Sequence, residues 1–215
     1  MHLKEISASI QSGNIRVTEE LIAKAIREKH KPVRILREGL AAGIMEMQKR
    51  HQREEILDSE LRISERAFKA GLHLLELGLE TGQSQYPGAI VIGTAEGDIR
   101  ETEKDLASCL MRSLGLRVID LGTSVPNAVF IDAAIDEKAR IIACAVSLTS
   151  FMSQIKALVQ AAGKAKIRSR TKILLTGSPV TEWFCRCIDA DIYAPDPIKA
   201  ADMAAEHCGK CLRQA

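Results

Sequence analysis

A series of short apolar runs that begins after Gly88 is the feature that most constrains the fold of this chain. Each run resembles a strand covered on both faces, and they lie at 89–93, 116–121, 141–146, 172–176 and, more weakly, 191–194. Segments with helical spacing alternate with these runs, at 102–114, 127–138, 152–164, 180–188 and 198–212. This alternation predicts an α/β domain with a five-stranded parallel sheet and right-handed crossovers.

The first 80 or so residues show a helical period and no strand pattern. Apolar residues recur at three-four spacing between Leu21 and Ile26, and Thr18 is predicted to be the N-cap of that helix. Pro32 is predicted to open the next helix, because its ring suits the first helical turn. Gly39 and Gly43 lie four residues apart along it and would let another helix approach closely.

We therefore expect four antiparallel helices around one core as a first domain, at residues 1–86. The polar, turn-rich segment Thr81–Gly88 is predicted to link it to the α/β domain, at residues 87–215.

Charge and composition exclude several classes of function. Lys and Arg number 30 against 28 Asp and Glu, with both signs mixed along the chain, and aromatic residues are 3% of the total. A nucleic-acid-binding protein usually carries a basic stripe and aromatic stacking platforms. The sequence has no apolar run of the ~18 residues that a membrane span needs, and the N-terminus lacks the layout of a signal peptide. We expect a cytoplasmic protein that binds neither nucleic acid nor membrane.

The six cysteines leave several interpretations open. Cys109 and Cys144 lie in apolar stretches typical of core thiols. The pair Cys208 and Cys211 could be a redox pair, or half of a zinc site that Cys185, Cys187 and His207 would complete. Reduced, incidental thiols are the favoured interpretation, because a Cys-x-Cys spacing is unusual for zinc.

The loops after the predicted strands are rich in small and hydroxyl-bearing residues. They are Thr94–Arg100, Ser147–Ser150 and Thr176–Pro179. Ligands of parallel sheets bind at the carboxyl ends of the strands, and such residues leave room there for a bulky molecule. No Gly-rich dinucleotide fingerprint or Walker lysine loop is present. The loops indicate a ligand-binding domain, although ordinary tight turns would have the same composition.

A more specific pattern lies in and around these loops. The sequence Gly93-Thr94-Ala95-Glu96-Gly97-Asp98-Ile99-Arg100-Glu101-Thr102-Glu103 stands where corrinoid proteins have Gly-Thr-x-x-Gly-Asp-x-His-x-x-Gly. Further matches are Gly43 to Met47, Val118 to Gly122, Val125-Pro126, Leu148-Thr149, Gly177 to Thr181 and Tyr193 to Asp196. Over nearly its full length the chain resembles the corrinoid proteins of methyltransferase systems and the cobalamin modules of methionine synthase.

The resemblance implies a four-helix cap followed by a flavodoxin-like (Rossmann-like) domain that binds cobalamin. The residues implied to contact the cofactor are Gly97, Asp98, Ile99, Arg100, Glu103, Gly122, Ser147, Leu148, Thr149, Thr176, Gly177, Ser178, Tyr193 and Ala194. The residues implied to cover the upper corrin face are Met47, His51 and Leu57. His51 could coordinate an upper ligand, but an exposed histidine near a helix end is the favoured interpretation.

The chain departs from the family pattern at the position of the cobalt ligand and at other positions around the cofactor. Arg100 occupies the position of the histidine that binds cobalt from below, and a guanidinium offers no lone pair to a metal. We therefore expect Asp98 to pair with Arg100. Glu103 and Thr176 each replace a family glycine. At the family's Ser-x-Leu motif the chain has Ala145 and Ser147.

The expected function is that of a methyl-group carrier that works with corrinoid-dependent methyltransferase subunits, and a homodimer is one oligomeric state open to it. A substrate barrel needs about 250 residues of its own, so the chain is at most one subunit of such a system. Cobalamin would be bound without a protein histidine as lower ligand. Two alternatives remain open: a non-catalytic cobalamin protein for storage, delivery or sensing, and a family member that no longer binds cobalamin.

Overall fold

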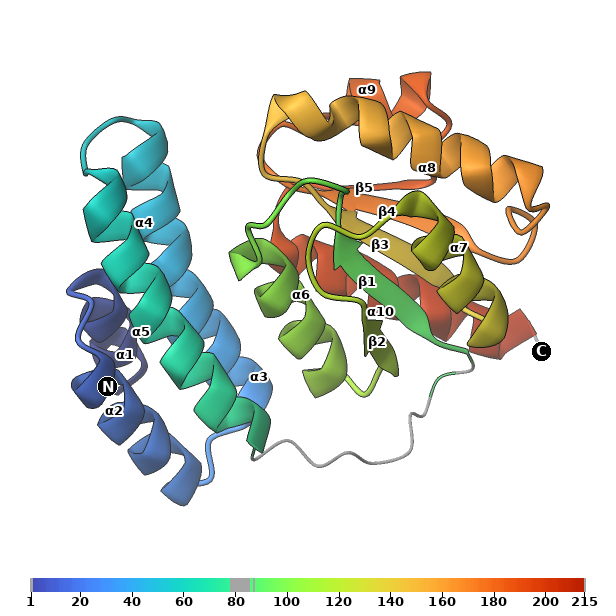
Figure 1. The fold of residues 1–215 in the computed structure, drawn as a ribbon. Helices are drawn as coiled ribbons and strands as arrows, with labels where there is room; N and C mark the ends of the chain where they lie inside the picture. The colour runs from blue at the N-terminus through green and yellow to red at the C-terminus, as the bar shows by residue number, and fades with distance from the viewer. Residues whose placement is uncertain (1, 78–85, 87, 215) are drawn as a thin grey trace. The chain divides into compact units, whose positions relative to one another are not determined.

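The computed structural model describes residues 2–77, 86 and 88–214, with side chains as far as residue 209. The chain divides into two compact units, Met1–Thr81 and Gly82–Ala215 (Figure 1). The predicted linker Thr81–Gly88 lies almost entirely outside the described residues. The two units are described separately below.

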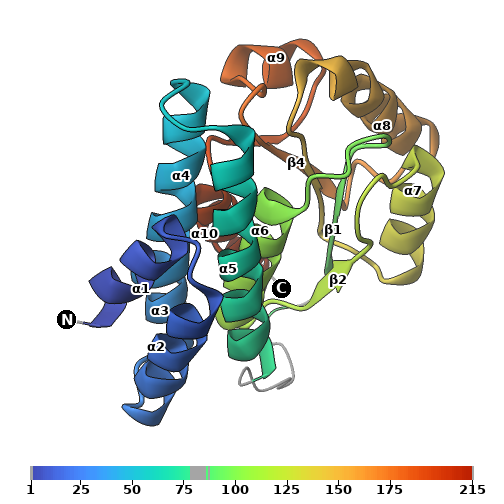
Figure 2. The ribbon, with the colours of Figure 1, turned by 60° about the vertical axis from the view of Figure 1, so that its left-hand side comes forward.

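The first unit is helical, as the apolar spacing predicts. Its elements are α1 (His2–Gln11), α2 (Ile15–Arg27), α3 (Pro32–Ile35), the π-helix η1 (Leu36–Ala41), α4 (Ala42–Gln52) and α5 (Asp58–Leu77). Because α3, η1 and α4 follow one another without a gap, the described residues form four helical rods. Figures 1 and 2 both show α4 alongside α5. Fully buried side chains such as Ile6, Ile22, Leu40 and Phe68 come from all four rods and make one core.

The prediction that Thr18 caps α2 is wrong. The helix begins one turn earlier, and the Asn14 side chain accepts a hydrogen bond from the Val17 amide at 3.1 Å. Thr18 is fully buried inside the helix, where its hydroxyl lies 2.8 Å from the Ser9 hydroxyl of α1. Both residue types make good caps. Asn14 takes the role because the chain turns sharply at Gly13, with φ of 68°, and so starts α2 at once.

The prediction that Gly39 and Gly43 permit a close helix approach is confirmed. A Cβ atom on Gly43 would lie 2.9 Å from the Ser7 carbonyl oxygen, and one on Gly39 would lie 3.0 Å from Ile6 Cγ2. Helix α1 thus packs directly on the backbone of the rod that carries both glycines.

The second unit contains the predicted parallel sheet. Its strands are β1 (Ile90–Thr94), β2 (Val118–Asp120), β3 (Ile141–Ala145), β4 (Lys172–Thr176) and β5 (Ile192–Ala194). They pair in the order β2-β1-β3-β4-β5, and every pair is parallel. The connecting helices are α6 (Thr102–Ser113), α7 (Asn127–Asp136), η2 (Thr149–Phe151), α8 (Met152–Lys164), α9 (Glu182–Cys187) and α10 (Pro197–Gln214). The α/β class and the positions of all five runs are confirmed.

The helices form a layer on each face of this sheet. Side chains such as Val91, Ile142 and Leu175 form one core with Phe130 of α7 and Ile155 of α8. Side chains alternate between the two faces along a strand, so the residues on either side of Val91, Ile142 and Leu175 face α6 and α10. These two helices pack against each other. In Figure 1 these two helices lie on the opposite side of the sheet from α7 and α8.

The last register row on the α6 and α10 face consists of Thr94, Ala145, Thr176 and Ala194. These residues end β1, β3, β4 and β5, and so form the floor beneath the strand-end loops. Within the described ranges, no helix combines the length and the hydropathy that crossing a bilayer would take.

We predict that Gly43→Ala lowers the free energy of unfolding by about 1–3 kcal/mol, because the added methyl group would press on the backbone of α1. Gly163→Ala on α8 is the matched control, since nothing lies within 4 Å of the added atom. It should stabilise the chain by about 0.5 kcal/mol. Urea unfolding followed by circular dichroism measures both, and equal effects at the two positions would contradict the close packing of α1.

Candidate functional site at the strand ends

The carboxylate of Asp98 joins two of the strand-end loops. Asp98 is 1% exposed, and its Oδ2 accepts a hydrogen bond from the Ser147 amide at 2.7 Å. Its Oδ1 accepts from the Ser147 hydroxyl at 2.8 Å and from the Arg100 amide at 3.1 Å. Asp98 follows β1 and Ser147 follows β3, so one buried charge fixes the loops of two adjacent strands relative to each other.

The expected pairing of Asp98 with the Arg100 side chain is wrong. Asp98 uses the Arg100 backbone amide, in a turn where an aspartate accepts from the amide two residues on. The Ser147 amide and hydroxyl supply its other bonds, and Arg100 itself is exposed. Ser147, at the position of a family leucine, is therefore the partner that reasoning from the sequence missed. The available signal was a hydroxyl residue directly after the strand next to the one that precedes Asp98.

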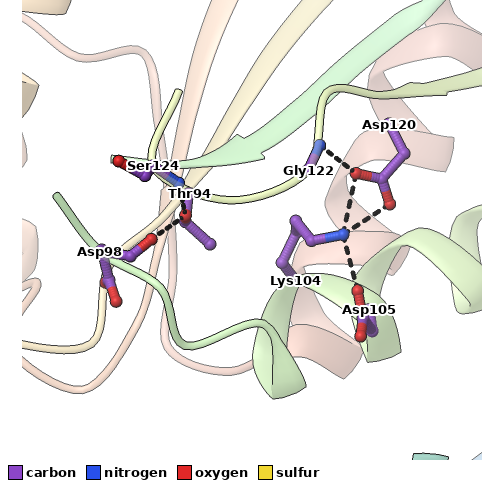
Figure 3. A network of polar contacts seen from close by, with 7 residues as sticks. All are labelled: Thr94, Asp98, Lys104, Asp105, Asp120, Gly122 and Ser124. Atoms are coloured by element: carbon purple, nitrogen blue, oxygen red, sulfur yellow. Dashed lines mark hydrogen bonds and ion pairs between the residues drawn. The ribbon is translucent and has the colours of Figure 1, made fainter. Parts of the chain in front are cut away.

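Thr94 and Ser124 hold the first loop from below, and neither was predicted as a site residue. The fully buried Thr94 hydroxyl donates to the Asp98 carbonyl and accepts from the Ser124 amide at 2.8 Å (Figure 3). The Ser124 hydroxyl in turn accepts from the Gly97 amide at 2.9 Å. The loops after β1 and β2 are thus bound together through backbone groups, which no local sequence pattern indicates.

A buried lysine binds the start of α6 to the end of β2. Lys104 is 3% exposed, and its Nζ lies 2.6 Å from Asp105 Oδ1 and 2.7 Å from Asp120 Oδ2 (Figure 3). Burial alone would lower the pKa of Lys104, but the hydrogen bonds and charges of the two aspartates outweigh it and raise the pKa. Asp120 also accepts from the Gly122 amide at 2.9 Å, which orders the loop after β2.

Two glycines keep the backbone of the loops close to its surroundings. Gly177 has φ of 129°, and a Cβ atom there would lie 1.8 Å from the Val146 carbonyl oxygen. Gly97 has φ of 89°, and its Cβ atom would lie 2.9 Å from the Phe151 ring. Both backbone conformations favour glycine, and neither loop can carry a side chain at these points without moving.

Thr176 has a buried hydroxyl group that forms no hydrogen bond within the described part of the chain. The residue is 1% exposed, and its hydroxyl oxygen has no hydrogen-bond partner among the described residues. Buried hydroxyl groups are nearly always paired. Its neighbours in the last row of the sheet, Ala145 and Ala194, are small and do not compete for the space around it.

Glu103 lies in the first turn of α6 and is partly buried. Burial, together with the charges of Asp98 and Asp196, raises its pKa from 4.5 to about 7, although Arg100 opposes the shift. Near neutral pH, Glu103 can therefore be either a hydrogen-bond donor or an acceptor.

The remaining predicted contacts lie at the rim or in the floor of the same loops. Ile99 is 77% exposed and Leu148 is 43% exposed, so both offer apolar surface at the rim. Thr149 is exposed in η2, and Ser178 donates to the Ser147 carbonyl at 3.5 Å. Tyr193 is half-buried, and Ala194 belongs to the floor. These predicted residues all belong to one end of the sheet.

The predicted cap residues of the first unit have different environments. Met47 is buried at 2% exposure, whereas Leu57 is 69% exposed. His51 Nε2 lies 2.5 Å from Asp58 Oδ1, so a carboxylate already engages one ring nitrogen.

The structure describes the side chains of all the cysteines except Cys211. Cys109, Cys144, Cys185 and Cys208 are buried, and Cys187 is exposed. The side chain of Cys211 lies outside the described residues. Within the described part of the chain, no three His, Cys, Asp or Glu residues are placed to hold a metal ion.

Both units match family models that carry the same description. Family models described as a B12 binding domain match residues 88–201 and, separately, residues 2–76. A relative, trimethylamine corrinoid protein 1 of Methanosarcina mazei, is 31% identical over 81% of this chain and 82% of its own.

Two solved structures are also similar. The monomethylamine corrinoid protein of Methanosarcina barkeri has a TM-score of 0.80 and 25% identity, covering 95% of this chain and 97% of its own. The methanol:cobalamin methyltransferase complex MtaBC from the same organism has a TM-score of 0.55 at 20% identity. It covers 97% of this chain and 80% of its own, and at that identity it supports the fold alone.

The raised pKa of Glu103 predicts a pH-dependent stability. Between pH 4.5 and about 7 the folded chain keeps a proton that the unfolded chain has released, so stability falls as the pH rises through that window. We expect the wild type to lose about 2 kcal/mol of unfolding free energy across this window, and Glu103→Gln to remove that loss. The value is reduced for the solvent that still reaches this side chain.

Urea unfolding at pH 5 and at pH 8 measures this difference. Glu96→Gln, at an exposed position of the loop after β1, is the matched control for losing a carboxyl group. A Glu103→Gln variant that keeps the full pH dependence of the wild type would show that Glu103 is not its source.

Proposed function

Because this chain belongs to the B12-binding family of corrinoid proteins, we propose that it is the methyl-group carrier subunit of a corrinoid-dependent methyltransferase system. Its partners would be the methyltransferase subunits that load and unload the carrier. Residues 1–86 would form the helical domain and residues 87–215 the cofactor domain. The observation that carries the proposal is the strand-end site of the second unit, whose loops are fixed by Asp98 and Ser147.

The residues of this site fit a corrinoid. Gly97 and Gly177 let two of the loops pack closely against Phe151 and the Val146 carbonyl, which fixes the loop backbone on which the cofactor would lie. Ile99 and Leu148 offer apolar surface at the rim, which suits contact with a flat macrocycle. Thr176 and Glu103 offer polar atoms to the amide and nucleotide arms of the cofactor.

These residues would hold a corrinoid, which would supply methyl-transfer chemistry at its cobalt. Arg100 does not take part as a metal ligand, because its guanidinium stays protonated and has no free lone pair. Asp98 orients the loop backbone through the Arg100 amide and does not polarise an imidazole. We therefore infer that this loop would supply no cobalt ligand, so that cobalamin would be bound without a protein histidine as lower ligand.

The direct test is reconstitution of the full chain with cobalamin. We predict that corrin absorption bands stay with the protein through desalting, in a spectrum without the features of histidine ligation. A chain that retains no corrin bands would refute the proposal. Methyl-exchange assays with candidate methyltransferase subunits then separate a carrier from a protein for storage, delivery or sensing, since a protein of the second kind would bind cobalamin without exchange.

Arg100→His tests the position of this loop. The carboxylate of Asp98 accepts three hydrogen bonds and has room for one more, so an imidazole at position 100 can be oriented by it. We predict that the spectrum of the loaded variant shifts toward a histidine-ligated form.

Arg100→Gln is the control, because it removes the same charge without supplying a strong metal ligand. It should keep the wild-type spectrum. An unchanged spectrum in loaded Arg100→His would show that the loop does not lie beneath the cobalt.

A further inference from the structure

A pocket lies at the edge of the sheet opposite the strand-end site, where the strands begin. It has a volume of about 480 Å³, and four cationic side chains line it, those of Arg117, Lys138, Arg140 and Arg170. Gly88, Ala139 and Glu137 complete the lining. These residues precede or adjoin the starts of β1, β2, β3 and β4.

The parallel sheet fixes the positions of the lining residues. The Ile90 amide donates to the Arg117 carbonyl, and the Arg140 amide donates to the Ala89 carbonyl, each at 2.8 Å. The Thr171 hydroxyl donates to the Ala139 carbonyl at 2.8 Å, which holds the loop before β4 against the loop before β3. The pocket therefore rests on ordered backbone at the ends of the strands.

Gly88 has a specific role in this wall. Its φ is 80°, and a Cβ atom there would lie 2.7 Å from Arg140 Cγ and 3.1 Å from the Lys138 carbonyl oxygen. The absence of a side chain lets the aliphatic part of Arg140 lie directly on the backbone that leads into β1. Arg140 is thereby placed in the pocket wall.

The positive charges of the pocket are only partly balanced. Arg117 forms an ion pair with Glu137. Lys138 directly follows the C-cap of α7, where the helix dipole favours a cation. Arg140 and Arg170 lie in neither of these arrangements, and no carboxylate pairs with them among the described residues. The cavity is thus lined by two guanidinium groups that pair with no carboxylate of the described residues.

We propose that this pocket is a binding site for a small polyanion that carries phosphate groups. Arginine presents a planar fork that binds phosphate oxygens in pairs, and the volume is within the range of small-molecule sites. The lining contains no aromatic side chain, so the charged groups and not a stacked base determine recognition. The pocket is at the opposite edge of the sheet from the strand-end site, so the proposed cofactor does not account for it.

The test is calorimetric titration of the full chain with inorganic tripolyphosphate at low ionic strength. One site is expected, and Arg140→Gln and Arg170→Gln should each weaken binding about tenfold, as the loss of a charged hydrogen-bonding partner does. Arg16→Gln is the matched control. It removes the same charge from an exposed residue of the first unit that pairs with Glu20 and does not line the pocket.

Each other outcome decides against the proposal. No binding by the wild type would refute the site, and equal losses in Arg16→Gln and Arg140→Gln would show an effect of net charge alone. Tighter binding of a polyglutamate peptide than of tripolyphosphate would assign the pocket to an acidic protein segment. Cobalamin loading of the same variants, read from corrin absorption, should not change, so a failure of this proposal is distinct from a failure of the carrier function.

Discussion

The buried charge of Asp98 is the interaction on which the strand-end site depends. An ionised carboxylate is expensive to remove from water unless hydrogen bonds replace its hydration. Here three donors do so, two from Ser147 and one from the Arg100 backbone. The same charge contributes to the raised pKa of Glu103. The path of the loop after β1 and the position of the loop after β3 therefore share one cause, and the same carboxylate adds to the effect of burial on the pKa of Glu103.

Local patterns predicted the elements of the second unit to within a few residues. The runs at 141–146 and 172–176 became β3 and β4, because burial on both faces of a parallel strand leaves a continuous apolar signal. The cap of α2 was predicted wrongly, since Asn14 and Thr18 satisfy the same local rule. The sharp turn at Gly13 and the packing of α1, which places Ser9 beside Thr18, decide between them. The contact between Asp98 and Ser147 spans 49 positions and depends on strand register, so no local pattern contains it.

The net charge of +2 conceals an uneven distribution across the sheet. Parallel strands collect residues that are remote in the sequence, so the cations near positions 117, 140 and 170 come together at the amino edge. Carboxylates gather at the other edge, where Asp98, Glu103 and Asp196 interact. Helix N-termini lie at the carboxyl edge and helix C-termini at the amino edge, and the dipoles favour this arrangement of charge. A count of charges along the chain can exclude a basic stripe, but it cannot show an asymmetry that only the topology creates.

Thr176 and Glu103 stand where the family pattern has glycine, and they bear on whether the strand-end site still has a ligand. A buried hydroxyl without a partner costs about 1–3 kcal/mol, and Thr176 is in that condition among the described residues. A carboxyl group whose pKa is raised to about 7 also destabilises the folded chain at neutral pH. Glycine at either position would remove the cost. Both side chains weaken the fold and have no hydrogen-bond partner within the described chain. A ligand that supplies the missing hydrogen bonds accounts for them best. This favours a working cofactor site over one that has lost its cofactor.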